Sequence, residues 1–392
     1  MSQPTAPSDS LDVAVAAAPA APRWTAAPEP APEAVGAVGT VAGIVLAGSH
    51  VWSDDPVQRL LRSPVLPLAH VPLICHPLMW LRAGGLDEAV VCAGRANADV
   101  HAAVGTHTAD GLALEYYTDI HPRGPAGCAR DALALVDADT LVIVEGTLIP
   151  VVSLADLLES HRRTRADVTT VVEVDRRRRG LAGERLALPG GIYLFERHVL
   201  ERVATTGFQD IKQGLLEQVY ASTARVNVHE VRGVSPRIID LPTYTAVNSW
   251  LIGTLADRPA LRAGYEQVGE AWVHTTARVH PTARLIGPVQ IGPDAFVGPH
   301  AVIVGPSSIG AGSTVESSAL VSRSIVWDGA TIGAGALVDA ALLADEATIA
   351  GGDSVRGTVS LGGETTVRPV IALPAGAART LAQPLNTAAR AF

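Results

Sequence analysis

The sequence predicts an α/β domain with a parallel sheet, followed by a parallel β-helix. Two observations indicate this fold class. Short apolar runs alternate with segments of helical period up to about residue 255, and from there on aliphatic residues recur at every sixth position. Alternating strands and helices are typical of β-α-β units with helices on both faces of the sheet. A repeat of six residues is typical of a β-helix, in which each hexad forms one side of a triangular coil.

The α/β domain is expected to span residues 41–255 and to begin with the apolar run 41–48, which is typical of a buried strand entering a loop. Similar runs follow at 88–93, 140–144 and 168–174. Residues 153–164 place three leucines on one face of a helix. Residues 1–40 contain 12 Ala and 7 Pro and show no apolar period, which predicts a disordered tail.

The β-helix is predicted over residues 273–365, after a linker at 256–272 and before a tail at 366–392. Its aliphatic positions keep one phase over eight hexads, then shift by one residue before Val326 and again before Leu343. The first phase comprises Val279, Leu285, Ile291, Val297, Ile303, Ile309, Val315 and Val321. These side chains are expected to point into the coil, so Ile303 should be buried and the neighbouring outward residue Ser308 exposed.

The composition excludes several classes of function. Among 392 residues, 39 acidic and 30 basic side chains give a net charge of −9, whereas a nucleic-acid surface would need a basic face. Three cysteines cannot all pair and form no Cys-x-x-Cys motif, which indicates a reducing, cytoplasmic compartment. The uncharged stretch 63–81 contains four prolines, which would break a membrane-spanning helix. We therefore expect neither a nucleic-acid partner nor a membrane anchor.

Five short segments of the α/β domain occur in the order typical of one enzyme family. They are Ile44-Val45-Leu46-Ala47-Gly48, the stretch 64–74, Gly124-Pro125-Ala126-Gly127, Gly191-Ile192-Tyr193-Leu194-Phe195 and the stretch 239–244. Together with the hexapeptide coil, these segments resemble the sugar-nucleotide pyrophosphorylases. That family comprises sugar-1-phosphate nucleotidyltransferases and includes the mannose-1-phosphate guanylyltransferases. The resemblance implies a Rossmann-like nucleotidyltransferase domain followed by a left-handed parallel β-helix.

The resemblance also implies where substrates would bind. In such enzymes a sugar phosphate attacks the α-phosphorus of a nucleoside triphosphate, while backbone N–H groups, cations and Mg²⁺ neutralise the phosphate oxygens. The implied nucleotide-binding residues are Leu46, Ala47, Gly48, Gly124, Ala126, Gly127 and the flanking Arg130. The implied sugar-binding residues are Gly191 and Asp210, and the implied Mg²⁺ ligands are Asp240 and Glu145.

This sequence departs from the family's pattern at residues that carry the chemistry. Val51 and Trp52 stand in the phosphate loop, where the family has glycine and arginine, and Val65 stands near the position of a family lysine. Gly146 aligns with the family's metal-binding aspartate. Glu145 lies one position earlier on the same strand, so it would need a local bulge to replace that aspartate.

Three functions remain open on these observations. The first is a degenerate or regulatory homologue that binds a nucleotide or nucleotide sugar and acts with a catalytic paralogue. The second is an active, divergent pyrophosphorylase, in which Glu145 and Asp240 hold Mg²⁺ and arginines bind the phosphates. The third is a hexapeptide acyltransferase with His274, His280 or His300 as its base. Because a parallel coil has flat sides and open ends, we expect a homo- or hetero-oligomer.

Overall fold

The computed structural model describes residues 39–48, 56–61, 63–118, 123–179, 185–360 and 368–369. Residues 1–38, most of the predicted C-terminal tail, and the segment that contains Val51 and Trp52 lie outside the described residues. We call residues 41–253 the head and residues 265–360 the coil.

The head is built on a seven-stranded sheet in the order β5-β4-β1-β6-β8-β7-β9. Its strands are β1 (Val41–Leu46), β4 (Glu88–Cys92), β5 (Ala113–Tyr116), β6 (Thr140–Glu145), β7 (Val168–Arg179), β8 (Arg185–Glu196) and β9 (Val226–Arg232). The first four in this order are mutually parallel, whereas β8 is antiparallel to both β6 and β7. Only residues 180–184 separate β7 from β8, which is too short for a crossover helix. The predicted β-α-β pattern is therefore interrupted between β7 and β8.

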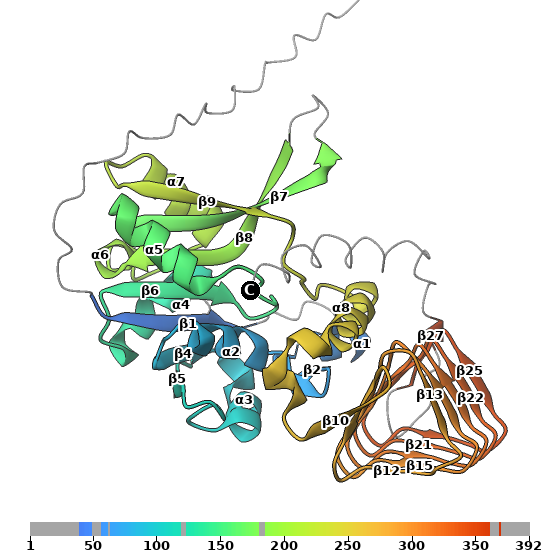
Figure 1. Ribbon diagram of the computed structural model, residues 1–392. Coiled ribbons are helices and arrows are strands. Elements are labelled where there is room, and N and C mark those ends of the chain that lie inside the picture. Colours follow the sequence, from blue (N-terminus) through green and yellow to red (C-terminus); the bar gives the residue numbers. More distant parts are fainter. Residues whose placement is uncertain are drawn as a thin grey trace, which may run out of the picture. The chain divides into compact units, whose positions relative to one another are not determined.

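Helices cover both faces of this sheet (Figure 1). One apolar cluster joins it to α2 (Cys75–Ala83), α3 (Asn97–Val104) and α5 (Leu154–Thr164). A second cluster joins its other face to α4 (Gly124–Ala132), α6 (Arg197–Leu200), η3 (Ile211–Leu215) and α7 (Leu216–Tyr220). Side chains alternate along a strand, so Val45 belongs to the first cluster and Ile44 to the second. The helix predicted at 153–164 is confirmed as α5, which Ser153 caps by accepting a hydrogen bond from the Asp156 amide.

Short elements connect these layers and lead into the coil. They are α1 (Pro56–Leu61), β2 (Pro67–Leu68), β3 (Val71–Pro72), η1 (Gly94–Ala96), η2 (Leu133–Leu135), α8 (Leu241–Gly253), η4 (Leu255–Asp257) and η5 (Pro259–Arg262). The predicted linker 256–272 thus contains helical turns and the first strand of the coil. No helix among the described residues is long and apolar enough to cross a membrane.

The coil has three sheets, one for each side of a triangle (Figure 1). The first contains β10 (Tyr265–Val268), β11 (Ala271–His274), β14 (Val289–Ile291), β17 (Ser307–Ile309), β20 (Ile325–Val326), β23 (Leu342–Leu343), β26 (Thr358–Ser360) and β27 (Arg368–Pro369). The second contains β12 (Arg278–Val279), β15 (Phe296–Val297), β18 (Thr314–Val315), β21 (Thr331–Ile332) and β24 (Thr348–Ile349). The third contains β13 (Arg284–Ile286), β16 (Val302–Val304), β19 (Leu320–Ser322), β22 (Leu337–Asp339) and β25 (Ser354–Arg356). All pairs are parallel except β10–β11 and β26–β27, so the predicted parallel β-helix is confirmed.

Strand pairing explains the two phase shifts in the repeat. Ile291 pairs with Ile309, 18 residues later, whereas Ile309 pairs with Val326, only 17 residues later. The later turns are therefore one residue shorter. The shortening falls at one corner, where Arg323 and Ala340 adopt positive φ angles of 49° and 51°.

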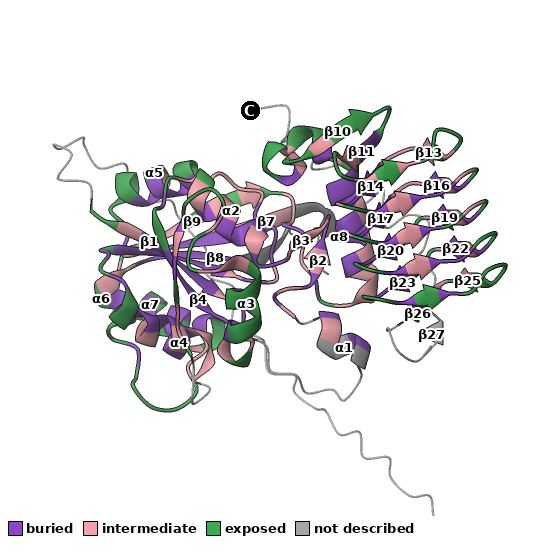
Figure 2. Ribbon diagram, turned by 90° about the horizontal axis from the view of Figure 1, so that it is seen from below, coloured by how far each residue is buried: buried purple, intermediate pink, exposed green. Residues whose placement is uncertain are grey.

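One side of the coil is covered by the head, which makes the expectation for Ser308 wrong. The Ser308 side chain points outward, as the phase predicts, but it is only 2% exposed and accepts a hydrogen bond from Asn248 Nδ2 at 3.3 Å. Helix α8 packs on this first sheet (Figure 2). In this row, the outward residue of β14 is the buried Gln290, and those of four other strands are apolar and belong to the same buried cluster, namely Trp272, Ile325, Leu342 and Val359.

Candidate functional site

The carboxyl ends of β1 and β6 bring several predicted site residues together. Leu46 and Glu145 are paired at these ends, and the Gly146 amide donates to the Leu46 carbonyl oxygen at 2.8 Å. The Ala47 amide donates to the Cys92 carbonyl oxygen at 2.9 Å, and Gly48 is exposed. The phosphate-loop segment 49–55 that follows lies outside the described residues.

Glu145 forms two ion pairs and is the centre of this arrangement. Its Oε2 contacts the Arg237 guanidinium, and its Oε1 lies 2.9 Å from the Lys212 Nζ. Burial by itself raises the pKa of Glu145, but the charges of Arg237 and Lys212 outweigh it and lower the pKa below its ordinary value. The carboxylate proposed as a metal ligand is therefore ionised and held by two cations.

Arg237 is a site residue that the sequence analysis missed. Hydrogen bonds on either side attach its segment to the loop after β6: Ile149 N donates to Pro236 O at 2.9 Å, and Ile238 N donates to Thr147 O at 3.2 Å. No motif covers position 237, and only three-dimensional contact reveals its role. The sequence does single out Lys212, because it is the sole lysine of the chain.

Gly191 packs directly against this ion cluster. Its φ angle is +71°, and a Cβ placed there would lie 2.7 Å from Arg237 Nη2 and 2.8 Å from the Glu145 carboxyl carbon. No other residue fits without moving the pair. The predicted sugar-binding glycine thus forms the floor beneath Glu145 and Arg237.

Asp210, the second predicted sugar-binding residue, caps η3. Its Oδ1 accepts hydrogen bonds from the Lys212 and Gln213 amides, both at 2.7 Å. This cap fixes the backbone from which Lys212 reaches Glu145.

The predicted nucleotide-binding turn lies beside the same segment. The Ala126 amide donates to Gln209 O at 3.0 Å, and a Cβ on Gly124, whose φ is +78°, would lie 2.5 Å from that oxygen. Ala126 and Gly127 are buried in α4. Arg130 pairs with its neighbour Asp131 at 2.7 Å.

Asp240, the other predicted metal ligand, is the N-cap of α8. Its Oδ1 accepts from the Thr243 amide at 2.8 Å, and its own amide donates to the Thr243 hydroxyl at 3.0 Å, which completes a capping box. Mg²⁺ requires several oxygen ligands that are free to coordinate it. Among the described residues there is no group of three or more His, Cys, Asp or Glu side chains that could hold a metal. With Glu145 held by two cations and Asp240 in a cap, the donors do not fit Mg²⁺.

Position 146 has no room for the family's aspartate. A Cβ on Gly146 would lie 2.7 Å from the Ala47 Cβ and 2.9 Å from the Ala47 Cα. An acid at this position would require the ends of β1 and β6 to separate.

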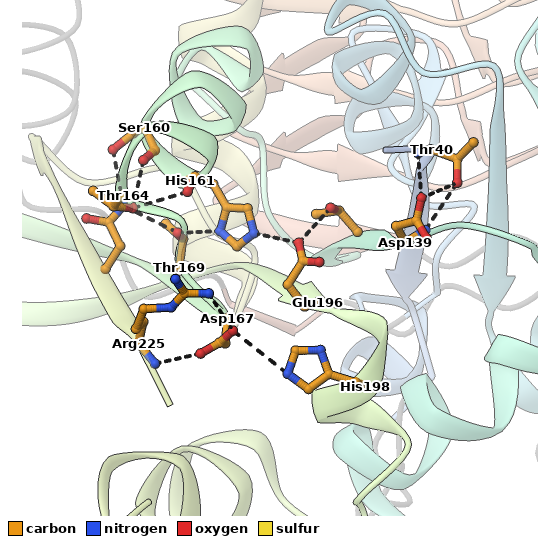
Figure 3. A network of polar contacts seen from close by, with 12 residues as sticks. Thr40, Asp139, Ser160, His161, Thr164, Asp167, Thr169, Glu196, His198 and Arg225 are labelled. Carbon is orange, nitrogen blue, oxygen red and sulfur yellow. Dashed lines mark hydrogen bonds and ion pairs between the residues drawn. The ribbon is translucent and has the colours of Figure 1, made fainter. Parts of the chain in front are cut away.

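A second polar cluster in the head links a hydroxyl, an imidazole and a carboxylate, as a hydrolase triad does, but its role is structural. His161 lies between the Thr169 hydroxyl, at 2.7 Å from Nδ1, and Glu196, at 3.0 Å from Nε2 (Figure 3). Thr169 is 0% exposed, so no substrate can reach its hydroxyl. The network instead holds α5 against β7 and β8.

Comparisons with known proteins agree with this architecture. A family model described as the GMPPB C-terminal domain matches residues 267–377. A mannose-1-phosphate guanylyltransferase of Mycobacterium tuberculosis (strain ATCC 25618 / H37Rv) is 29% identical over 272 residues, which cover 64% of this chain and 75% of that protein. Over this stretch the chain is therefore similar to a sugar-1-phosphate nucleotidyltransferase.

Two further proteins are similar to parts of this chain. A glucose-1-phosphate thymidylyltransferase of Streptomyces griseus is 25% identical over 124 residues, 32% of this chain and 35% of that protein. A solved structure of a putative glucose-1-phosphate thymidylyltransferase from Bacillus anthracis, in complex with a sucrose, aligns with a TM-score of 0.46 and 16% identity. It covers 53% of this chain and 94% of that chain.

Proposed function

We propose that this chain is a non-catalytic member of the nucleotidyltransferase family that binds a nucleotide or nucleotide sugar. The observation that carries the proposal is the double ion pair of Glu145 with Arg237 and Lys212. A divalent cation at Glu145 would have to displace both side chains, and Asp240 is engaged in the α8 cap. The tight approach of Gly146 to Ala47 further disfavours a metal-binding side chain at the end of β6.

The same cluster suits an anionic ligand. Arg237 and Lys212 carry two positive charges against the single charge of Glu145, and Lys212 is 42% exposed. Beneath the cluster, the buried Tyr193 hydroxyl has no hydrogen-bond partner among the described residues, and burial raises its pKa, so it stays a neutral donor.

The names of the relatives suggest the ligand class. They transfer guanylyl and thymidylyl groups to mannose-1-phosphate and glucose-1-phosphate. We therefore propose a hexose linked to a nucleoside diphosphate, bound without Mg²⁺. A regulatory member would act with a catalytic paralogue or a second copy of itself, which light scattering of the purified protein alone and mixed with the paralogue would detect.

The decisive experiment measures turnover and binding on the same preparation. With nucleoside triphosphate, sugar-1-phosphate and Mg²⁺, we expect no pyrophosphate release. In calorimetry, GDP-mannose or dTDP-glucose should bind equally well with Mg²⁺ and with EDTA. Robust pyrophosphate release would instead support an active, divergent pyrophosphorylase. Absence of binding by every nucleotide and nucleotide sugar would overturn the proposal.

A further inference from the structure

The outer edge of β9 lies far from the site in sheet order. β8 and β7 separate β9 from β6, and β9 is the last strand of the head sheet. Among the described residues, no strand pairs with its other side. This edge runs from Val226 to Arg232 and lies beside α5.

The direction of the free backbone groups follows from the register with β7. The Arg225 carbonyl oxygen accepts from Val168 N at 3.2 Å, and Val168 pairs with Val226. Backbone groups of successive strand residues point to opposite sides. Asn227 and His229 therefore bond toward β7, and Val228 and Glu230 direct their N–H and C=O groups to the free edge.

A groove accompanies this edge. It has a volume of about 520 Å³ and is lined by Asp156, Glu159, Ser160 and Arg163 of α5 and by Asn227, Val228, His229 and Glu230 of β9. Val228, at this free edge, is 37% exposed. A strand edge beside a helix, with an accessible apolar residue, is the geometry by which recognition domains bind extended peptides.

The walls of the groove are fixed. Asn227 Nδ2 donates to the Ser160 hydroxyl at 3.1 Å, which ties β9 to α5. Asp167 accepts from the Arg225 amide at 2.7 Å and so holds the start of β9 (Figure 3). A fixed groove loses little entropy when a segment binds in it.

The charge of the groove indicates the charge of the segment that it would bind. On the α5 side of the sheet, two carboxylates, those of Asp156 and Glu159, line the groove together with one guanidinium, that of Arg163. Burial lowers the pKa of His229, so this side chain is neutral near pH 7. The groove therefore carries a net negative charge and complements lysine or arginine side chains.

We propose that the edge of β9 binds a basic, extended segment of a partner protein, which adds to the head sheet as a further strand beside α5. Its backbone would pair with Val228 and Glu230, and its basic side chains would face Asp156 and Glu159. This site is independent of the nucleotide site, so either proposal can fail alone.

The test uses the full chain and labelled octapeptides in which lysine or arginine alternates with threonine or valine. Fluorescence anisotropy should detect binding that weakens with salt, and glutamate counterparts should not bind. N-methylation of alternate peptide amides should weaken binding about tenfold, because the ladder needs those N–H groups.

Two variants locate the binding on β9. Val228→Pro removes an edge N–H without removing a bond to β7, so it should keep the melting temperature and abolish peptide binding. Glu159→Lys should weaken binding, whereas the matched control Glu88→Lys, at an exposed residue at the start of β4, should not. Absence of binding up to about 1 mM peptide, equal binding by N-methylated peptides, or equal effects of the two charge changes would each overturn the proposal.

Discussion

The Trp327 indole N–H donates to the Tyr244 hydroxyl across 2.9 Å, and this hydroxyl donates in turn to the Pro67 carbonyl oxygen at 2.7 Å. Trp327 belongs to the coil, Tyr244 to α8 and Pro67 to the β2–β3 hairpin, so one buried phenol joins three segments. The rings of Trp327 and Tyr244 meet edge to face, with centroids 6.5 Å apart.

Tyr244→Phe should destabilise the chain through this phenol. The substitution keeps the ring but leaves the Trp327 N–H and the Pro67 carbonyl without their partner, which costs about 1–3 kcal/mol. We expect a melting temperature several degrees lower, measured by scanning calorimetry. Thr348→Val, which removes an exposed hydroxyl of the coil, is the control and should change little.

Ile303→Asp and Ser308→Asp should both destabilise the coil severely. Ile303 is 0% exposed inside it, and Ser308 is 2% exposed under α8, so each change buries an unpaired carboxylate. Thr348→Asp, at an exposed outward position of the second sheet, should be nearly silent. Urea denaturation of the three variants gives the ranking, and a mild effect at Ser308 would show that α8 does not cover this position in solution.

Stability should fall as the pH drops below about 6.5. Burial, helped by the nearby charge of His274, lowers the pKa of His70 to about 4, and burial together with Arg258 lowers the pKa of His76 to about 3. At a pH between these lowered pKa values and the ordinary histidine pKa of about 6.5, both histidines bind protons in the unfolded chain but not in the folded chain. Each histidine then lowers the free energy of unfolding by about 1.4 kcal/mol for every unit by which the pH falls.

The measurement is the urea midpoint at pH 7.5, 6.5 and 5.5. The double variant His70→Asn, His76→Gln should flatten the dependence, and asparagine suits the positive φ of 64° at position 70. Because the pKa of Glu145 is lowered from 4.5, loss of its ion pairs adds to destabilisation only at lower pH. An unchanged slope in the double variant would assign the effect to other groups.

Glu145→Gln should strengthen the binding of nucleotide anions. It removes the negative charge that opposes Lys212 and Arg237 while keeping the size of the side chain, so the local charge rises by one. We expect severalfold tighter nucleotide binding at low salt and still no pyrophosphate release. Calorimetry with EDTA present measures the change, and weaker binding by the variant would mean that Glu145 itself contacts the ligand.

Asp240 should act through the cap and not through a metal. Asparagine caps helices about as well as aspartate, so Asp240→Asn should leave stability and Mg²⁺-independent nucleotide binding unchanged. Asp240→Ala should cost about 0.5–2 kcal/mol of stability. If Asp240→Asn instead abolished a Mg²⁺-dependent turnover, the aspartate would have to be a metal ligand.

The coil was predictable from the sequence because its period is local. A side chain at every sixth position points inward whatever surrounds the coil, as Ile303 shows. What covers the outside is set by a distant segment, and this is why the period alone predicts the wrong exposure for Ser308. A signal was present: on the first sheet, the outward positions Ile325, Leu342 and Val359 are apolar, which is unnecessary for a side that faces water.

The candidate site was predictable only in part. The resemblance pointed to Glu145, Gly191 and Asp210, and the structure brings Gly191 against Glu145 and places Asp210 under Lys212. The partner Arg237 was not predictable, because it is 92 residues from Glu145 in the sequence and belongs to no motif. Residue type alone could not distinguish a cap from a ligand at Asp240.

Because the coil is shortened at the corner of Arg323 and Ala340, its height does not depend on the number of residues in each turn. Each turn advances by one strand spacing, about 4.8 Å, whether it has 18 or 17 residues. Because the change is absorbed at a bend, no inward side chain moves to another side of the prism. This corner is therefore where an epitope or fluorophore-binding peptide can be inserted while the stacking of the neighbouring turns is preserved.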